Sequence, residues 1–196
     1  MNPRASCLSA LLYSLLCAGC VVSTDYPTDW PKQMVTYDHD GCPDISGTYQ
    51  EPGIWASEGN SFSLTEYLLG LDAAPDSFSI SHESKDTIVI TTFASEEVSE
   101  SRAVYSRSSG DYTCDLGRLW ISKTTLLDPD GGIGVIIARV KEKFGFSRTE
   151  DGSLLAEHHG GGAGVMLVFG IVPIPSAATG NDYALWRPID SDAKPD

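Results

Sequence analysis

The sequence predicts a mainly β fold: an antiparallel meander or a partly closed β-barrel, with one short helix at about residues 63–70. The first observation is a series of short runs after Asp44 that are β-branched or alternate apolar with polar residues, as residues 87–93 illustrate. The second is the turn sequences rich in Gly, Pro, Ser and Asp between these runs. The third is that no long helical patterns alternate with the runs, which argues against a parallel α/β sheet.

Composition and charge exclude two classes of protein. The chain has 196 residues, 27 of them acidic and 13 basic, and its net charge is -14. A nucleic-acid-binding role is not expected, because phosphate binding needs clustered Lys and Arg. No apolar run reaches the roughly 20 residues of a membrane-spanning helix, so a protein with several such helices is also excluded.

The N-terminus has the layout of a secretory signal. Arg4 gives a short positive region, residues 8–16 are apolar, and residues 17–20 are small. The alternative, a buried N-terminal helix of the fold, fits poorly because the apolar run ends on Ala-Gly-Cys.

The end of this signal carries a family resemblance. The sequence Leu16-Cys17-Ala18-Gly19-Cys20 resembles the lipobox of bacterial lipoproteins, with Cys17 where that family usually has Leu. The resemblance implies cleavage before Cys20 and acylation of the new N-terminal Cys20, which would hold the protein on a membrane through several acyl chains. It also implies the outer membrane of a two-membrane cell, because Val21, and not Asp, follows the cysteine.

The chain is expected to have four segments. Residues 1–19 are the signal peptide, and residues 20–43, with three prolines and four aspartates in 21–43, are the lipidated N-terminus and a flexible tether. Residues 44–188 form one β-rich domain, and residues 189–196 a disordered acidic tail.

The cysteines support an exported chain. Cys7 and Cys17 leave with the signal and Cys20 is lipidated, so Cys42 and Cys114 remain and are predicted to form a disulfide. Two alternatives stay open: a pair of unrelated buried thiols, or a metal site that includes His39. The sequence has no Cys-x-x-Cys pair and offers too few further ligands for a metal, so none is expected.

The domain is expected to consist of strands joined by short turns. Residues 77–81 have the period-two alternation of a half-buried strand, and Asp151-Gly152 is a strong signal for a two-residue hairpin turn. The expected strands are residues 45–50, 77–81, 87–93, 104–105, 112–114, 119–121, one or two strands in 133–146, with 144–148 and 154–157 as the arms of the hairpin, and then 165–169 and 183–186.

The predicted helix rests on its two ends. Ser63 and Glu66 have the spacing of a capping box, and Gly70 stands where a C-terminal stop belongs. The apolar face containing Leu64, Leu68 and other large residues should cover an open end or edge of the sheet.

Two loops resemble functional motifs but lack essential parts. The sequence 158–164, His-His-Gly-Gly-Gly-Ala-Gly, resembles the oxyanion segment of some esterases, but the chain has no Gly-x-Ser-x-Gly nucleophile motif, so we interpret it as a hairpin loop. The sequence 128–132 begins like a calcium loop but has Ile133 and Arg139 where an EF-hand needs Gly and Glu. We therefore expect neither an enzyme nor a cofactor or metal.

One cluster of charge remains. Arg139, Lys141 and Lys143 alternate along a predicted strand and share one face, and Arg148 follows shortly after. In so acidic a chain they are a candidate contact for an anionic envelope partner, either lipid phosphate or an acidic protein surface. The alternative is an ordinary solvated sheet face.

The expected function follows from the anchor. The sequence predicts a non-enzymatic, lipid-anchored protein of the cell outer membrane that faces the periplasm, touches the membrane through its N-terminal lipid, and has an interaction or structural role. The alternative is a β-barrel carrier that binds a lipid or another small apolar ligand.

Overall fold

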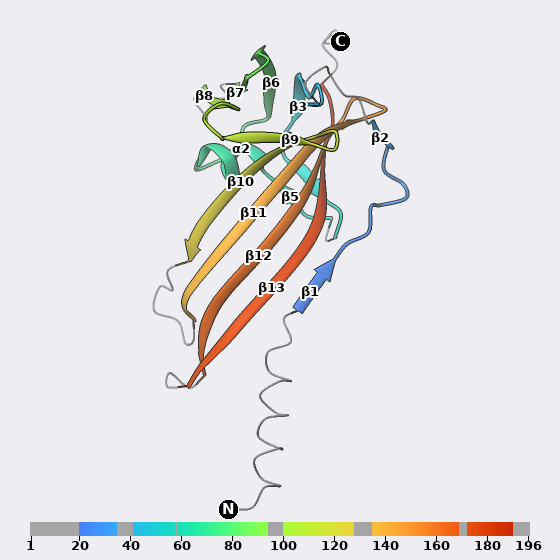
Figure 1. The fold of residues 1–196 in the computed structure, drawn as a ribbon. Coiled ribbons are helices and arrows are strands. Elements are labelled where there is room, and N and C mark those ends of the chain that lie inside the picture. Colours follow the sequence, from blue (N-terminus) through green and yellow to red (C-terminus); the bar gives the residue numbers. More distant parts are fainter. Residues whose placement is uncertain are drawn as a thin grey trace, which may run out of the picture. The chain divides into compact units, whose positions relative to one another are not determined.

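The fold is mainly β, with antiparallel sheets and one short helix, as predicted (Figure 1). The computed structural model describes residues 20–34, 41–57, 59–93, 100–127, 135–168 and 172–189. Within these residues the strands form two sheets, and neither sheet closes into a barrel.

The elements follow one another with short connections. Their bounds are β1 (Cys20–Ser23), β2 (Gln33–Met34), β3 (Gly47–Gln50), β4 (Gly53–Trp55), β5 (Ser61–Phe62), α2 (Leu64–Leu69), β6 (Ser77–Ser84), β7 (Thr87–Thr92), β8 (Ser101–Ser106), β9 (Tyr112–Asp115), β10 (Arg118–Leu127), β11 (Val135–Thr149), β12 (Leu154–Val168) and β13 (Val172–Trp186).

The larger sheet has nine strands in the order β5-β4-β13-β12-β11-β10-β9, and β1 and β2 join it at its sides. β1 pairs in parallel with β13, whereas β2 pairs antiparallel with β11. The predicted hairpin between β11 and β12 is confirmed, but its turn is longer than the two residues predicted. The Thr149 N–H donates to the Ser153 carbonyl at 3.0 Å, which leaves residues 150–152 in the loop, and Gly152 takes a positive φ of 84°.

The interpretation of residues 158–164 as a loop is wrong. β12 continues through them as one strand from Leu154 to Val168. The physical reason is that β12 lies between β11 and β13, so the ladder hydrogen bonds of two neighbours hold a glycine-rich segment extended.

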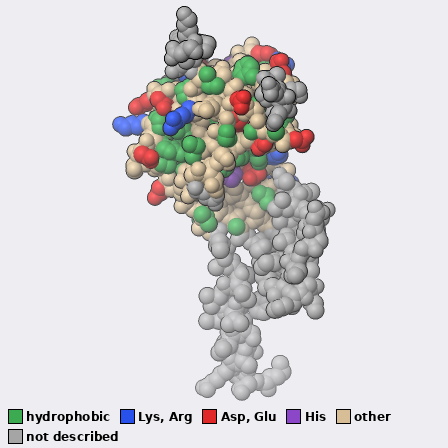
Figure 2. Space-filling model, turned by 180° about the vertical axis from the view of Figure 1, so that it is seen from behind, with side chains coloured by type: hydrophobic (Ala, Val, Ile, Leu, Met, Phe, Trp, Pro, Cys, Tyr) green, Lys and Arg blue, Asp and Glu red, His purple; other side chains and the backbone are tan. Residues whose placement is uncertain are grey.

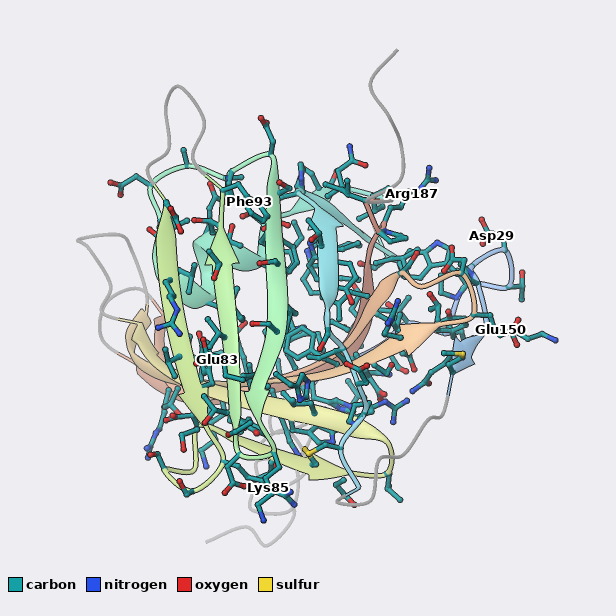
Figure 3. All side chains as sticks on the ribbon, turned by 90° about the horizontal axis from the view of Figure 1, so that it is seen from above. Asp29, Glu83, Lys85, Phe93, Glu150 and Arg187 are labelled. Atoms are coloured by element: carbon teal, nitrogen blue, oxygen red, sulfur yellow. A yellow bond between two sulfur atoms is a disulfide. The ribbon has the colours of Figure 1, made fainter. Side chains whose placement is uncertain are left out.

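The smaller sheet is an antiparallel set of four strands, β3-β6-β7-β8. Figure 3 shows Lys85, in the turn between β6 and β7, and Phe93, after β7, at opposite ends of this sheet. Ile88, Val89 and Ile90 of β7 are all buried, as expected for a β-branched strand inside a sheet.

The helix α2 is confirmed with both of its predicted ends. The Ser63 Oγ accepts a hydrogen bond from the Glu66 N–H at 3.1 Å, which satisfies one free donor of the first turn. Gly70 adopts a left-handed conformation with φ 67°, and its N–H donates to the Glu66 carbonyl. Leu64 is fully buried, and the Tyr67 ring lies 4.9 Å from the Phe144 ring, so the helix packs against β11.

A buried carboxylate fixes the start of this helix. The Glu51 Oε1 accepts hydrogen bonds from the Ser63 Oγ, the Thr65 N–H and the Thr65 Oγ1 at 2.9 to 3.0 Å. The Glu51 Oε2 accepts one from the Trp186 Nε1 at 2.7 Å. Burial raises the pKa of Glu51, and the four donated hydrogen bonds oppose that rise.

The contacts of the chain divide it into two units, which we describe separately. The core unit comprises Thr24–Ser122, Lys143–His158 and Asp182–Asp196, and the β1 unit comprises Met1–Ser23, Lys123–Glu142 and His159–Asn181. The sequence-based boundaries at 43 and 188 stay predictions, and residues 190–196 of the expected tail lie outside the described residues.

The core unit contains one hydrophobic cluster built from both sheets. It includes large, fully buried side chains, each of which stabilises the fold by about 1.5–3 kcal/mol relative to exposure. Among them are Tyr49, Phe78, Ile88, Ile90, Leu119, Phe144, Phe146, Leu154 and Trp186.

Residues 20–34, the first part of the expected tether, are held on the sheet. Besides β1 and β2, the Glu150 N–H donates to the Lys32 carbonyl at 2.9 Å, and the Tyr26 ring packs edge-on against Tyr183 at 5.3 Å. The Tyr26 hydroxyl donates to the Pro31 carbonyl. Residues 35–40 lie outside the described residues. No described helix is long and apolar enough to cross a membrane.

Candidate functional site

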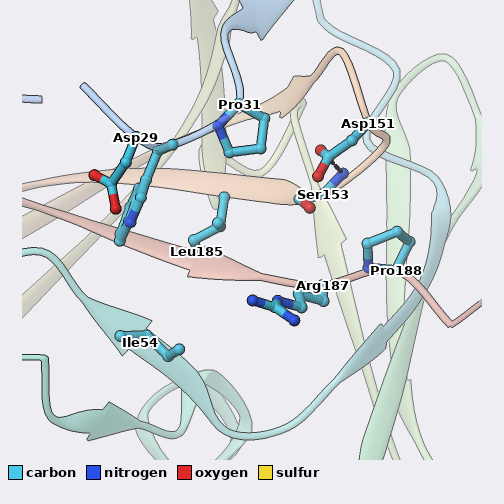
Figure 4. Close-up of a pocket in the computed structure, with 9 residues that line it drawn as sticks. Asp29, Pro31, Ile54, Asp151, Ser153, Leu185, Arg187 and Pro188 are labelled. Carbon is cyan, nitrogen blue, oxygen red and sulfur yellow. Dashed lines mark hydrogen bonds between the residues drawn. The ribbon is translucent and has the colours of Figure 1, made fainter. Parts of the chain in front are cut away.

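A cleft of about 450 Å³ opens in the core unit where the N-terminal segment meets the sheet (Figure 4). One wall is residues 29–31, which a turn and β2 hold against the β11–β12 hairpin. The other walls come from β4 and from the end of β13. The lining residues are Asp29, Trp30, Pro31, Ile54, Asp151, Ser153, Leu185, Arg187 and Pro188.

Backbone pairing positions the C-terminal wall. Ile54 lies opposite Leu185 in the β4–β13 ladder, and the Arg187 carbonyl accepts from the Gln50 N–H at 2.9 Å. Two residues later the Ile189 N–H donates to the Thr48 carbonyl at 2.8 Å. Because the backbone is held at Arg187 itself and again at Ile189, the exposed Arg187 side chain stays beside the cleft.

The cleft carries an ionised acid. The Asp151 carboxylate accepts hydrogen bonds from the Thr149 Oγ1 at 2.6 Å and the Ser153 N–H at 3.1 Å. Burial alone would raise the pKa of Asp151, but these hydrogen bonds outweigh it and lower the pKa. Asp151 therefore remains charged at neutral pH.

A buried hydroxyl lies in the lining of the same cleft. Ser153 is fully buried, and its Oγ has no hydrogen-bond partner among the described residues. A buried polar atom of this kind costs free energy until it is paired. Figure 4 shows Leu185 between Asp29, Asp151 and Arg187, so the cleft combines an apolar floor with charges of both signs. Such a surface suits a polar or peptide-like partner better than an apolar ligand.

The predicted disulfide is present. Cys42 and Cys114 are bonded with their Cα atoms 5.0 Å apart, and they close a loop with a sequence separation of 72. The bond joins the segment before β3 to β9, and Cys42 is buried. His39 of the alternative metal site lies outside the described residues.

The predicted lipid-attachment residue begins a strand. Cys20 is the first residue of β1 and lies opposite Ala178 of β13. The pairing is close, because a Cβ on Gly180 would come within 2.9 Å of the Val22 carbonyl oxygen. Val21 and Val22 are 77% and 66% exposed. Lipidation itself stays a prediction.

The four predicted basic residues lie in different surroundings. Arg139, Lys141 and Lys143 are exposed on β11, as alternation predicts. The Lys143 Nζ lies 4.1 Å from the centre of the Trp120 ring, a cation–π contact. Arg148 is half-buried, faces the other side by strand alternation and lies opposite Met34 of β2. Contact with an anionic partner stays a prediction for all four.

Sequence reasoning missed the cleft and a partly buried ion pair. The Arg118 Nη2 lies 2.6 Å from the Glu157 Oε2 and donates to the Gln33 Oε1 at 3.2 Å. The Asp151-Gly152 turn was a usable signal for one wall of the cleft. Nothing in the local sequence of 29–31 indicates that this segment forms another wall.

His158 packs as an aromatic residue. Its ring stacks on Phe144 at 4.5 Å and lies 5.5 Å from the Trp55 ring. Among the residues that the structure describes, no group of three or more His, Cys, Asp and Glu side chains could hold a metal ion.

Comparisons of the chain with protein-family models, with curated proteins and with solved structures found no match.

Proposed function

We propose that this protein is a lipid-anchored lipoprotein of the cell outer membrane that faces the periplasm and has a non-enzymatic interaction role. Cys20 carries the lipid, and the cleft of Figure 4 receives the partner. The observation that carries the proposal is that residues 20–34 are held on the sheet, so the segment that begins at the anchor also forms a wall of the cleft.

Two features support export. The positive residue, apolar run and Ala18-Gly19-Cys20 sequence resemble a lipoprotein signal. The Cys42–Cys114 disulfide is typical of oxidising compartments such as the periplasm. Together they favour a protein that folds after it has left the cytoplasm.

The carrier role receives no such support. A β-barrel carrier holds its ligand in an apolar interior. The described strands do not close, and the interior of the core unit is filled by aromatic and aliphatic side chains. The cleft, in contrast, is open and partly charged. We therefore do not propose a carrier.

The anchor is tested by fractionating cells that produce Cys20→Ala, with Cys7→Ser as the matched control. Cys20→Ala should leave the membrane fraction or keep an uncleaved signal, because it offers no thiol for acylation. Cys7→Ser should behave as the wild type. Wild-type mobility and membrane association in Cys20→Ala would contradict the anchor.

The cleft is tested by photo-crosslinking in intact cells. A crosslinking amino acid at position 187 should give a discrete adduct, and Leu185→Glu should abolish that adduct by placing a charge on the apolar floor. The control carries the crosslinker at the exposed position 85, at the tip of the β6–β7 hairpin. The same adducts from both positions, or an adduct insensitive to Leu185→Glu, would contradict a binding role of the cleft.

A further inference from the structure

Charge is absent from a long part of the β1 unit. From His159 to Asn181 the sequence contains no Asp, Glu, Lys or Arg, and residues 131–138 contain none either. The chain as a whole is 20% charged. A long uncharged segment in an acidic protein is typical of a surface that contacts a membrane or another protein.

The backbone brings the uncharged segments together. β11, β12 and β13 are neighbours in the larger sheet, so residues 135–138, 159–168 and 172–181 lie in adjacent strands. A Cβ on Gly162 would lie 3.5 Å from the Val140 side chain, and one on Gly161 would lie 3.5 Å from Thr179. These distances show the register by which the segments align.

The described side chains of the β1 unit are accessible to solvent. None of the described side chains of the β1 unit is buried, and Ala163 and Thr179 are exposed. A sheet normally buries at least one of its faces against a second layer. An uncharged sheet whose described side chains remain accessible is therefore expected to contact something outside the described chain.

Two cations lie where the uncharged part of β11 ends. Arg139 and Lys141 are exposed, share one face and follow directly on residues 135–138. Their long apolar stems allow the charged ends to reach outward from an apolar surface. In a chain of net charge -14 they favour an anionic occupant. On the face seen in Figure 2, the acidic side chains are scattered rather than gathered in one patch.

The proposed anchor lies in the same unit. β1 begins at Cys20 and pairs with residues 178–181 of β13, within the uncharged segment. Figure 1 draws β1 beside β13. Acyl chains on Cys20 would therefore start next to this sheet.

We infer that the β1 unit lies directly on the bilayer: its uncharged strand ends contact the lipid interface, and Arg139 and Lys141 bind the phosphates of anionic lipid headgroups. The inference rests on the proposed function, because it uses the lipid on Cys20. A lipid anchor alone would leave the sheet free in solution, so direct contact is a separate property.

The test uses the full lipidated protein, reconstituted in vesicles of phosphatidylcholine and phosphatidylglycerol that contain a lipid with a spin-labelled acyl chain. Ala163→Cys in β12 carries an environment-sensitive fluorophore, and Ser109→Cys, exposed in the core unit, is the matched control. The disulfide and the lipidated Cys20 leave no competing thiol in the mature chain. Strong quenching at 163 with little at 109 is the expected result.

Three results would overturn the inference or its basis. Equal, weak quenching at both positions in protein that floats with the vesicles would overturn bilayer contact but keep the anchor. Protein that does not float would overturn the proposed function itself. A crosslink between two copies at position 163, without quenching, would assign the surface to self-association and would also overturn the inference.

The cations are tested in the same vesicles. Arg139→Ser together with Lys141→Ser should weaken quenching at 163 when phosphatidylglycerol is present, because each cation near an anionic surface shifts the equilibrium by about fivefold. Pure phosphatidylcholine should show little difference. Lys32→Ser with Lys85→Ser, two exposed lysines of the core unit, is the matched control. An equal loss of quenching at position 163 in both double variants would overturn the role of Arg139 and Lys141.

Discussion

Glu51 shows how far the role of one side chain depends on contacts distant in the sequence. Its local sequence, Glu-Pro-Gly, predicts an exposed turn. In the structure it is 5% exposed and accepts hydrogen bonds from Ser63 and Thr65 at the start of α2 and from Trp186 at the end of β13. Turn chemistry could predict the break in the chain but not these three partners, because they meet only in the folded state.

Glu51→Gln should lower the free energy of unfolding by about 1–3 kcal/mol at neutral pH. The amide NH2 of Gln cannot accept a hydrogen bond, so at least one of the four donors would lose its acceptor. Burial raises the pKa of Glu51 above 4.5, so its contribution to stability is largest below pH 4.5 and is lost as the pH rises through the folded pKa. This decrease in the free energy of unfolding with rising pH should be absent in Glu51→Gln. Urea unfolding across that pH range measures both effects.

Glu66→Gln is the control, because Glu66 lies exposed in the same helix. The account of Glu51 would be contradicted if Glu51→Gln and Glu66→Gln gave the same stability and the same pH dependence.

Gly145 tests the packing beneath Trp120. A Cβ at this position would lie 2.6 Å from the Trp120 ring, which is too close for the ring to stay in place. Gly145→Ala should therefore destabilise the core unit by about 1–3 kcal/mol and change the tryptophan fluorescence. In Gly162→Ala the added methyl group makes an ordinary contact at 3.5 Å, and thermal unfolding should show no such loss. Equal effects of the two changes would argue against this packing.

At the scale of elements, local signals were predictive and pairing between distant segments was not. The Ser63 cap, the Gly70 stop and the Asp151-Gly152 turn are encoded within a few residues, and all three are present. β1 and β2 could not be predicted, because Pro and Asp in residues 20–34 indicate a linker and only the sheet edges hold them extended. The glycines of β12 likewise indicated a loop, because the pairing with β11 and β13 that holds them extended cannot be seen in the local sequence.

The Cys42–Cys114 disulfide joins two such distant elements. Cys42→Ala with Cys114→Ala should lower the free energy of unfolding by roughly 4 kcal/mol, because the unfolded chain regains the freedom of a long loop. Reductant should destabilise the wild type by a similar amount and leave the double variant unchanged. The bond would be contradicted if reductant left the stability of the wild type unchanged and both cysteines could be alkylated without reduction.

At the scale of the whole molecule, the core unit and the β1 unit have different compositions. The core unit holds the hydrophobic cluster, the disulfide and the cleft. The β1 unit holds Cys20, the uncharged strand segments and, among its described residues, the exposed cations Lys123, Arg139 and Lys141. The sequence could predict the alternation of the cations, which is a local pattern, whereas the lipid on Cys20 stays a proposal. The cleft required the fold, since its walls come from four separate parts of the chain.

The lipid on Cys20 is tested most directly by the intact mass of the wild-type protein extracted from membranes, combined with sequencing of its N-terminal peptide. We expect a chain that begins at Cys20, carries the added mass of acyl chains on that residue and contains the Cys42–Cys114 bond. A membrane-extracted chain that begins at Met1, or one that begins at an unmodified Cys20, would contradict it.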